Sequence, residues 1–403
     1  MPAVLMSPSV LVTDGQERSA LAVVRSLGKA GCRVYVCSTT GRSLAGASRY
    51  CVADIKVPDA VTASRSFVAA VEGIVHERKI DVLIPISEGS LLSLLPEQHR
   101  LAGASVPFAA SESFRRICDK ETVLRTAARL GIATPPQHIL ASPADRAHFD
   151  PDSIRFPLVV KPARSLSDGN GARVRASVRH VADRDALDAA LDSYRPESYP
   201  LLLQQRIDGP GVGVFLLLWE GEVLATFAHR RIREKPPGGG VSVYCESVRQ
   251  SPDVIQRSVK LLQEFGWQGV AMVEYKIDQN DGTPYLMEVN GRFWGSLQLA
   301  IDAGVDFPAL LVAAAQGRHV EPVRDYRLGV RSRWLWGDVD HLVARLRRSD
   351  KQLDLRGKMP SRWRAVADFL TFWRAGDRND VFRLSDPLPF ARETLNWLLG
   401  RGL

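Results

Sequence analysis

The chain has 403 residues, of which 24% are charged and 45% hydrophobic, and its net charge at neutral pH is +8. This length suffices for two or three domains, and the composition is that of a globular protein. No apolar run approaches the roughly 20 residues that a membrane span needs, and the first residues do not predict a secretory signal. The five scattered cysteines form no metal-binding motif, so we expect free thiols and a cytoplasmic location.

The first part of the chain has the pattern of a small parallel α/β domain. The turn after its first strand carries one glycine, Gly15, whereas a dinucleotide fingerprint has three spaced glycines. A nicotinamide-dependent dehydrogenase is therefore the weaker interpretation. The expected strands lie at 10–13, 33–37, 51–55 and 81–85, with an edge strand at 104–108 and helices near 17–30 and 66–78.

A second unit of helices and strands follows. Asp119 has the residue type and position of an N-cap for a helix over 120–130. Lys120 then begins that helix, where the helix dipole disfavours a cation, so its ammonium must find an anion elsewhere. A strand over 156–162 carries Lys161 at its end, and a loop of small residues follows it.

A long hairpin is expected next, with strands over 212–218 and 222–229. Arg231 and Arg233 alternate on the continuing strand, so we expect both side chains on one face. Guanidinium groups bind carboxylates and phosphates through paired hydrogen bonds. The two arginines are therefore candidates for holding an acidic substrate or a phosphoryl group, beside a turn or lid at 236–240.

A further hairpin carries Glu274 and Glu288 inside otherwise apolar strands. A carboxylate buried alone is costly, so two side by side predict a bound cation. Asn290 lies two residues beyond Glu288, hence on the same face of the strand. This all-oxygen set suits Mg²⁺, with Mn²⁺ as the alternative ion, and Arg292 on the same face is placed to bind an anion.

From residue 321 onward the sequence is basic and rich in aromatic residues. The stretch 331–338 has the pattern of a strand that would help to form a substrate pocket. Residues 363–373 predict an amphipathic helix with Val366 and Phe369 on its apolar face, and two interpretations stay open. The helix packs on the core, or it makes a weak contact with an anionic membrane. The basic residues lack the pattern of a nucleic-acid-binding module, so no nucleic-acid partner is expected.

These features resemble the ATP-grasp superfamily, and the resemblance runs over about residues 1–320. It rests on Glu274 followed by Glu288-x-Asn290-x-Arg292, and on the order of the parts. The string from His229 to Ser242 resembles a branch of predicted carboligases, which is related to biotin carboxylase and the carbamoyl-phosphate synthetase large subunit. The implied fold combines α/β and α+β parts: a Rossmann-like pre-ATP-grasp domain (1–112), a first subdomain that forms the ATP lid (113–200), a second subdomain with the metal site (201–320) and a basic extension (321–403).

The resemblance also implies a role for individual residues. Hinge residues at the end of a strand over 201–207 would contact adenine, and relatives often hold the ribose with an acidic residue several positions later. Here that place reads Gly209 to Gly213, which leaves the ribose contact unassigned, with Asp208 as a candidate. The implied ATP-binding residues are Lys120, Lys161, Ser165, Ser167, Gly169, Gly171, Gln204, Gln205 and Ile207; the metal ligands are Glu274, Glu288 and Asn290; the catalytic residues are Arg231, Arg233 and Arg292.

The activity implied by the resemblance is ligation. Enzymes of this superfamily transfer the terminal phosphate of ATP to a substrate carboxylate, and an amine, or less often a thiol, then attacks the acyl phosphate. We therefore expect a small carboxylic acid and an amine as substrates. Two alternatives stay open: a carboxylase or carbamoyl-type enzyme that phosphorylates bicarbonate, and a nucleotide-binding module without turnover. A homodimer is also open.

Overall fold

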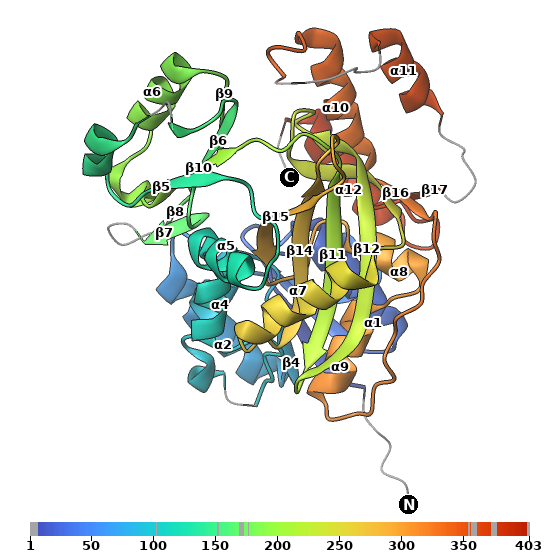
Figure 1. Cartoon of the computed structure of the whole chain (residues 1–403). Coiled ribbons are helices and arrows are strands. Elements are labelled where there is room, and N and C mark those ends of the chain that lie inside the picture. The colour runs from blue at the N-terminus through green and yellow to red at the C-terminus, as the bar shows by residue number, and fades with distance from the viewer. Residues whose placement is uncertain are drawn as a thin grey trace, which may run out of the picture.

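The structure is a computed structural model, and it describes residues 7–101, 103–150, 153–168, 173–175, 177–353, 355, 361–371 and 377–400. The described residues form sheets of four, four, seven and two strands, with helices packed against them (Figure 1). The mixed α/β and α+β fold class expected from the sequence is therefore confirmed.

The first unit is a parallel sheet with the strand order β3-β2-β1-β4. β1 is flanked by β2 on one side and by β4 on the other, so the strand order reverses between β1 and β4. The edge strand expected at 104–108 is reduced to one parallel bridge between Val82 and Ser105. The elements are β1 (Ser9–Val12), α1 (Arg18–Lys29), β2 (Arg33–Ser38), β3 (Cys51–Lys56), α2 (Ser64–Arg78), β4 (Val82–Ile84) and α3 (Glu88–Leu94), followed by α4 (Ser111–Ile117) and α5 (Lys120–Arg129).

The second unit is the lid, a four-stranded sheet of order β5-β10-β6-β9, with helix α6 packed against β9. Its buried residues, among them Leu158, Leu187 and Leu203, form a hydrophobic cluster separate from the main core. Because β10 is an internal strand of this sheet, the domain boundary expected at residue 200 falls inside the lid and is wrong. Its elements are β5 (Gln137–Leu140), β6 (Leu158–Pro162), β9 (Arg179–Val181), α6 (Arg184–Asp192) and β10 (Leu201–Gln205), with the small hairpin β7 (Leu166–Asp168) and β8 (Arg173–Arg175).

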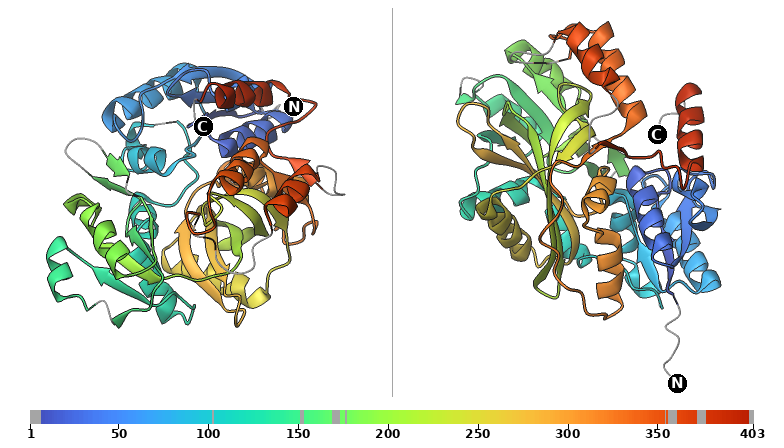
Figure 2. Two further views of the ribbon diagram at one scale, coloured as in Figure 1. Left: turned by 90° about the horizontal axis from the view of Figure 1, so that it is seen from above. Right: turned by 90° about the vertical axis from the view of Figure 1, so that its right-hand side faces the viewer.

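The third unit is a seven-stranded sheet of order β15-β14-β11-β12-β13-β16-β17. Helix α7 packs on one face, and α8 and α9 lie between the other face and α1 (Figure 2). The elements are β11 (Gly211–Trp219), β12 (Glu222–Lys235), β13 (Val241–Ser247), α7 (Pro252–Glu264), β14 (Gly269–Ile277), β15 (Pro284–Asn290), α8 (Leu297–Ala303), α9 (Phe307–Ala315), β16 (Arg331–Arg333) and β17 (Asp377–Asn379).

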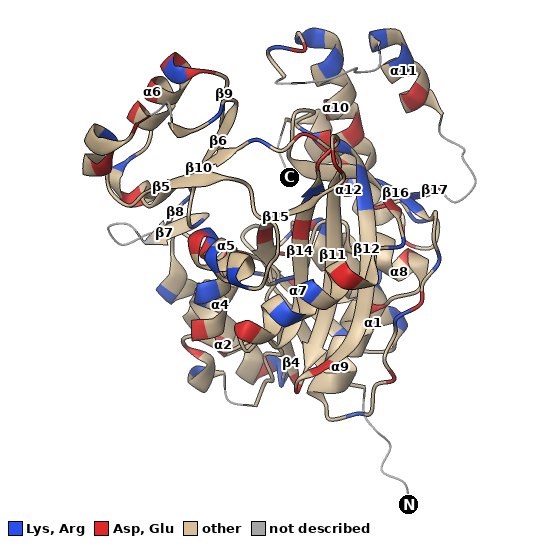
Figure 3. Ribbon diagram, viewed as in Figure 1, with Lys and Arg blue, Asp and Glu red and all other residues tan. Residues whose placement is uncertain are grey.

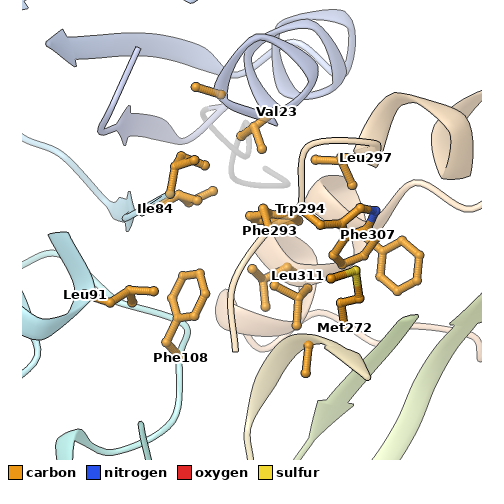
Figure 4. Close-up of a cluster of buried hydrophobic side chains, with 14 of the residues drawn as sticks. Val23, Ile84, Leu91, Phe108, Met272, Phe293, Trp294, Leu297, Phe307 and Leu311 are labelled. Carbon is orange, nitrogen blue, oxygen red and sulfur yellow. The ribbon is translucent and has the colours of Figure 1, made fainter. Parts of the chain in front are cut away.

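The first unit and the large sheet share one hydrophobic core (Figure 4). Ile84 and Phe108 come from the first unit, and they belong to the same cluster as Met272 and Trp294 of the large sheet and the chain that follows it. Since apolar burial is the main stabilising term, these two units form one body. The lid has a small core of its own and also joins the main core through Ala163 and Leu202.

The chain after residue 321 is integrated into this body. β16 and β17 extend the large sheet, so the strand expected at 331–338 ends at Arg333, and a helix begins at Leu335. Asp386 is buried against Arg25 of α1, with the carboxylate 2.9 Å from the guanidinium. The helices of this part are α10 (Leu335–Arg347), α11 (Arg362–Leu370) and α12 (Leu388–Leu398).

The amphipathic helix expected at 363–373 corresponds to α11. Phe369 is half-buried under the guanidinium of Arg333, which lies 4.3 Å from the ring centroid, whereas Trp363 is 84% exposed. The last two positions of the predicted helix lie outside the described residues. In the part of the chain that the structure describes, no single helix has the length and apolar composition of a membrane span; α8 and α9 pass that test only as a pair, which is bent by 91°.

We predict that Glu393 of α12 makes stability depend on pH. Its carboxylate is buried, accepts a hydrogen bond of 2.7 Å from the indole of Trp334, and has its pKa raised by that burial from 4.5 to about 7. Between these two pH values the folded chain binds more protons than the unfolded chain, so the free energy of unfolding falls as pH rises through this window.

Glu393→Gln mimics the protonated acid and removes this dependence. Relative to wild type, the variant should gain roughly 3 kcal/mol between pH 4.5 and 7.5, as measured by urea unfolding. The matched change Glu264→Gln at an exposed site should show no such trend. A difference between Glu393→Gln and wild type that is the same at every pH would contradict the prediction.

Candidate active site

The site is built on the hairpin of β14 and β15. Glu274 and Glu288 lie directly opposite each other in the register of the two strands. Figure 3 shows acidic residues on both β14 and β15. Opposite residues of an antiparallel pair project from the same face, with Cβ atoms about 5 Å apart. The two carboxylates therefore share one environment, as the sequence predicts.

Cationic and amide groups surround this acidic pair. Arg231 lies 2.5 Å from the carboxylate of Glu274, and the amide of Asn290 donates a hydrogen bond of 3.0 Å to Glu288. Burial raises the pKa of Glu274, although Arg231 opposes the shift. Burial also acts to raise the pKa of Glu288, but Lys120 and the other cations outweigh it and hold that pKa below its usual range. Glu288 is thus ionised at neutral pH.

Two lysines from different units converge on β15. Lys120 begins α5, donates a hydrogen bond of 2.9 Å to Ser165, and lies 3.8 Å from the carboxylate of Glu288. This contact supplies the anion that the sequence requires for Lys120, while Asp119 caps the helix as expected. Lys161, on β6 of the lid, is buried and donates a hydrogen bond of 3.2 Å to the carbonyl of Met287. Burial lowers the pKa of Lys161 to about 8, and Glu288 limits the shift.

Beyond Glu288, the end of β15 presents a chain of polar groups. The guanidinium of Arg292 donates a hydrogen bond of 3.1 Å to the side-chain oxygen of Asn290, and another of 3.0 Å to the carbonyl of Phe293. Gly291 lies between Asn290 and Arg292, and its position has no room for a side chain, because a Cβ there would lie 2.3 Å from the indole of Trp267. Close packing thus fixes the turn that carries Arg292.

These groups line a small, partly open pocket between the first unit, the loop after β6, and the end of β15, with about 330 Å³ of space including adjoining solvent. A wider cleft of about 1180 Å³, which Ser167 also lines, adjoins it. Gly169 and Gly171 of the same predicted loop lie outside the described residues. The first cavity is lined by Glu88, Phe114, Cys118, Lys120, Ser165, Glu288, Val289, Asn290, Gly291 and Arg292.

The first unit contributes cavity residues that the sequence did not single out, namely Glu88, Phe114 and Cys118. The one sequence feature that could have indicated a role for any of them is the position of Glu88 shortly after a predicted strand of the parallel sheet. Burial and the neighbouring Glu88 hold the pKa of the Cys118 thiol well above its usual range. A thiol that stays protonated is a weak nucleophile, so the site provides no activated cysteine.

Two glycines of β11 leave space for other side chains on the face of the sheet that carries the acidic pair. A Cβ at Gly211 would lie 3.0 Å from the side chain of Arg231. A Cβ at Gly213 would lie 2.5 Å from Phe215 and 2.9 Å from His229. The absence of side chains at these two positions lets Arg231 of β12 reach across β11 to Glu274 of β14.

Arg231 and Arg233 do not act together, contrary to the sequence prediction. Arg233 donates hydrogen bonds of 2.6 and 2.7 Å to the two carboxylate oxygens of Asp338 on α10, and it stacks on Tyr244. The strand register shifts on both sides of Arg233, which breaks the simple alternation. Arg231 therefore stays at the acidic pair, and Arg233 holds α10 against the sheet.

The predicted hinge lies beside the same hairpin. Gln204 is buried; its side-chain nitrogen donates to Gln137, and its side-chain oxygen lacks a hydrogen-bond partner among the described residues. Gln205 ends β10, and the carbonyl of Ile207 accepts a hydrogen bond of 3.3 Å from Lys276 of β14. A buried acceptor without a partner is costly, so the oxygen of Gln204 fits a role in binding a donor such as an adenine amino group. Asp208, the ribose candidate, is paired with Arg206 at 2.9 Å.

The donor set fits a hard divalent ion. Glu274 and Glu288 offer carboxylate oxygens, and a half-turn of the Asn290 amide would present its oxygen to the same place. No group of three or more His, Cys, Asp or Glu that could hold a metal occurs in the described ranges. A Mg²⁺ site on this hairpin therefore needs water or substrate oxygens as its remaining ligands, which is usual for that ion.

Comparison with known proteins supports this interpretation of the architecture. Residues 197–337, from the end of the lid to the start of α10, match the family described as ATP-grasp in the biosynthetic pathway with Ter operon. The chain carries an ATP-grasp domain. The matched segment includes both strands of the acidic hairpin and the predicted hinge. No curated protein matches the sequence significantly.

Solved structures of ATP-grasp enzymes share the fold at low sequence identity. An L-amino acid ligase from Bacillus licheniformis is 19% identical, with a TM-score of 0.59, over 77% of this chain and 75% of that one. Biotin carboxylase from Campylobacter jejuni is 15% identical, with a TM-score of 0.61, over 81% and 75%. The biotin carboxylase domain of 2-oxoglutarate carboxylase from Hydrogenobacter thermophilus is 17% identical, with a TM-score of 0.60, over 81% and 73%.

We predict that Gly213→Ala disturbs the packing behind the acidic pair. The new methyl group would overlap Phe215 and press on His229, so the free energy of unfolding should fall by about 1–3 kcal/mol. Urea unfolding measures this change. Gly73→Ala is the matched control, because that glycine lies within α2 with open space around its Cβ position, and the substitution should be neutral or stabilise by up to ~1 kcal/mol. Equal stability of Gly213→Ala and wild type would contradict the prediction.

Proposed function

We propose that the protein is an ATP- and Mg²⁺-dependent ligase that joins a carboxylic acid to an amine through an acyl phosphate. One observation carries the proposal: the directly opposed Glu274 and Glu288 meet Lys120, Lys161 and cavity-lining groups from three parts of the fold. Phosphoryl transfer depends mainly on positioning and charge neutralisation, and such a convergence of an acidic pair with cations can provide both.

Each side chain has a distinct task in this proposal. Glu274, Glu288 and Asn290 would hold Mg²⁺, which when bound neutralises phosphate charge and orients the phosphates of ATP. Lys120 and Lys161 would bind phosphate oxygens from either side of the loop after β6. Arg292, two residues beyond the end of β15, lines the same pocket and would bind the acid substrate or the phosphate that leaves the acyl group.

The similar proteins support the choice of reaction class. One is named as an L-amino acid ligase, one structure is described as a biotin carboxylase complex with β,γ-ATP, and another contains MgADP and bicarbonate. The Cys118 thiol stays protonated, which agrees with a mechanism in which ATP activates the acid and no enzyme thiol is acylated.

We predict that Glu288→Gln lowers acid-dependent release of ADP by at least about 100-fold, because a neutral amide binds Mg²⁺ weakly and leaves Lys120 without its anion. The measurement is ADP release with MgATP and pools of carboxylic acids and amines. Glu264→Gln, the same change at an exposed position, should keep the wild-type rate.

The wild-type protein distinguishes the competing functions in the same assay. Release that requires both an acid and an amine supports the ligase. Release stimulated by bicarbonate alone would indicate a carboxylase or carbamoyl-type enzyme, and no release with any pool would indicate a nucleotide-binding module. Unchanged release by Glu288→Gln would refute the assigned metal site.

A further inference from the structure

Glu88 occupies a position where parallel α/β sheets bind ligands. The strand order reverses between β1 and β4, and the crevice at such a point opens at the carboxyl ends of the two strands. The loops that follow these strands are hydrogen-bonded to each other: Asp14 accepts hydrogen bonds of 3.0 Å from both the backbone nitrogen and the hydroxyl of Ser87. Glu88 follows at once as the first residue of α3 and lines the cavity.

The carboxylate of Glu88 differs from the other carboxylate that lines this cavity. Glu288 accepts a hydrogen bond from Asn290 and lies near Lys120. Glu88 has no hydrogen bond or salt bridge to any residue that the structure describes. Burial raises the pKa of Glu88, and the nearby Lys120 and Arg292 oppose that shift. Glu88 is therefore a partly buried carboxylate without a hydrogen-bond partner in the wall of this pocket.

We propose that Glu88 is the residue that receives the amine substrate and accepts its proton. This inference rests on the proposed ligase function. It adds a binding site for the amine, formed by residues of the first unit, and a base that deprotonates the attacking nitrogen. An amine reaches the site mainly as an ammonium ion, which Lys120 and Arg292 repel and Glu88 attracts. The negative charge of Glu88 disfavours bicarbonate or a second carboxylate directly at this wall, so the structure assigns the subsite to an amine.

The step is balanced without any further reactant. The ammonium gives one proton to the Glu88 carboxylate, and the nitrogen lone pair then forms the C–N bond to the acyl carbon. The bond from that carbon to the phosphate oxygen breaks, and its electron pair leaves with inorganic phosphate. The remaining extra proton on nitrogen passes to the departing phosphate or to water, and the product is a neutral amide.

Hydroxylamine separates this step from the formation of the acyl phosphate. It is uncharged at neutral pH and traps an acyl phosphate as a hydroxamate without a base. With the carboxylic acid pool that stimulates ADP release, Glu88→Gln should form hydroxamate within about twofold of wild type. Amide formation with the amine pool should fall by about 100-fold, which is the usual contribution of a general base.

A matched variant and a stability measurement complete the test. Glu112→Gln changes an exposed carboxylate of α4 in the adjoining cleft and should leave both products at wild-type rates. Urea unfolding reports whether Glu88→Gln folds, because a glutamate in the first turn of a helix also contributes up to about 1 kcal/mol.

The outcomes separate the two proposals. Wild-type amide formation by Glu88→Gln would overturn the assignment, and so would a parallel loss of hydroxamate from a folded variant, since Glu88 would then act in the first half of the reaction. Failure of the wild-type protein to give hydroxamate with any acid would instead refute the ligase function itself. Hydroxamate retained and amide lost would support the acceptor subsite.

Discussion

The arrangement of the whole site depends on two carboxylates placed side by side on the neighbouring strands β14 and β15. Two partly buried negative charges at this separation repel each other, and partial burial penalises both. The structure offsets this cost with Arg231 at Glu274, and with Lys120 and Asn290 at Glu288. These cations come from β12 and from α5, which are far apart in sequence. The charge balance of one hairpin therefore requires the large sheet and the first unit to be assembled around it.

The two hydrophobic cores explain how such a site can hold its geometry. The first unit and the large sheet share one core, so Glu88, Lys120 and the acidic pair belong to one rigid body. The lid has its own small core, and it places Lys161 and Ser165 against that body through polar contacts with Met287 and Lys120. Leu202 and Ala163 of this region also reach the shared core, so the lid is attached by both apolar and polar contacts.

Local chemistry made the acidic hairpin predictable, and long-range pairing made other features unpredictable. Glu274, Glu288 and Asn290 could be placed from sequence because strand alternation and a short turn fix their relative positions. The same alternation failed for Arg233, because the register shifts that turn it toward Asp338 arise from pairing with β13. The lid boundary expected at residue 200 was misplaced, because β10 pairs with β5 and β6 rather than with the strand that follows it. Glu88 was missed because only the packing of the first unit against β15 brings it into the cavity.

The most direct test of this account is a crystal structure of the full chain with Mn²⁺ and a non-hydrolysable ATP analogue, with anomalous scattering recorded for the metal. The account predicts an anomalous peak at coordination distance from oxygens of both Glu274 and Glu288, with phosphate oxygens as further ligands and Lys120 and Lys161 at the phosphates. A nucleotide bound elsewhere, or a metal that contacts neither carboxylate, would contradict it.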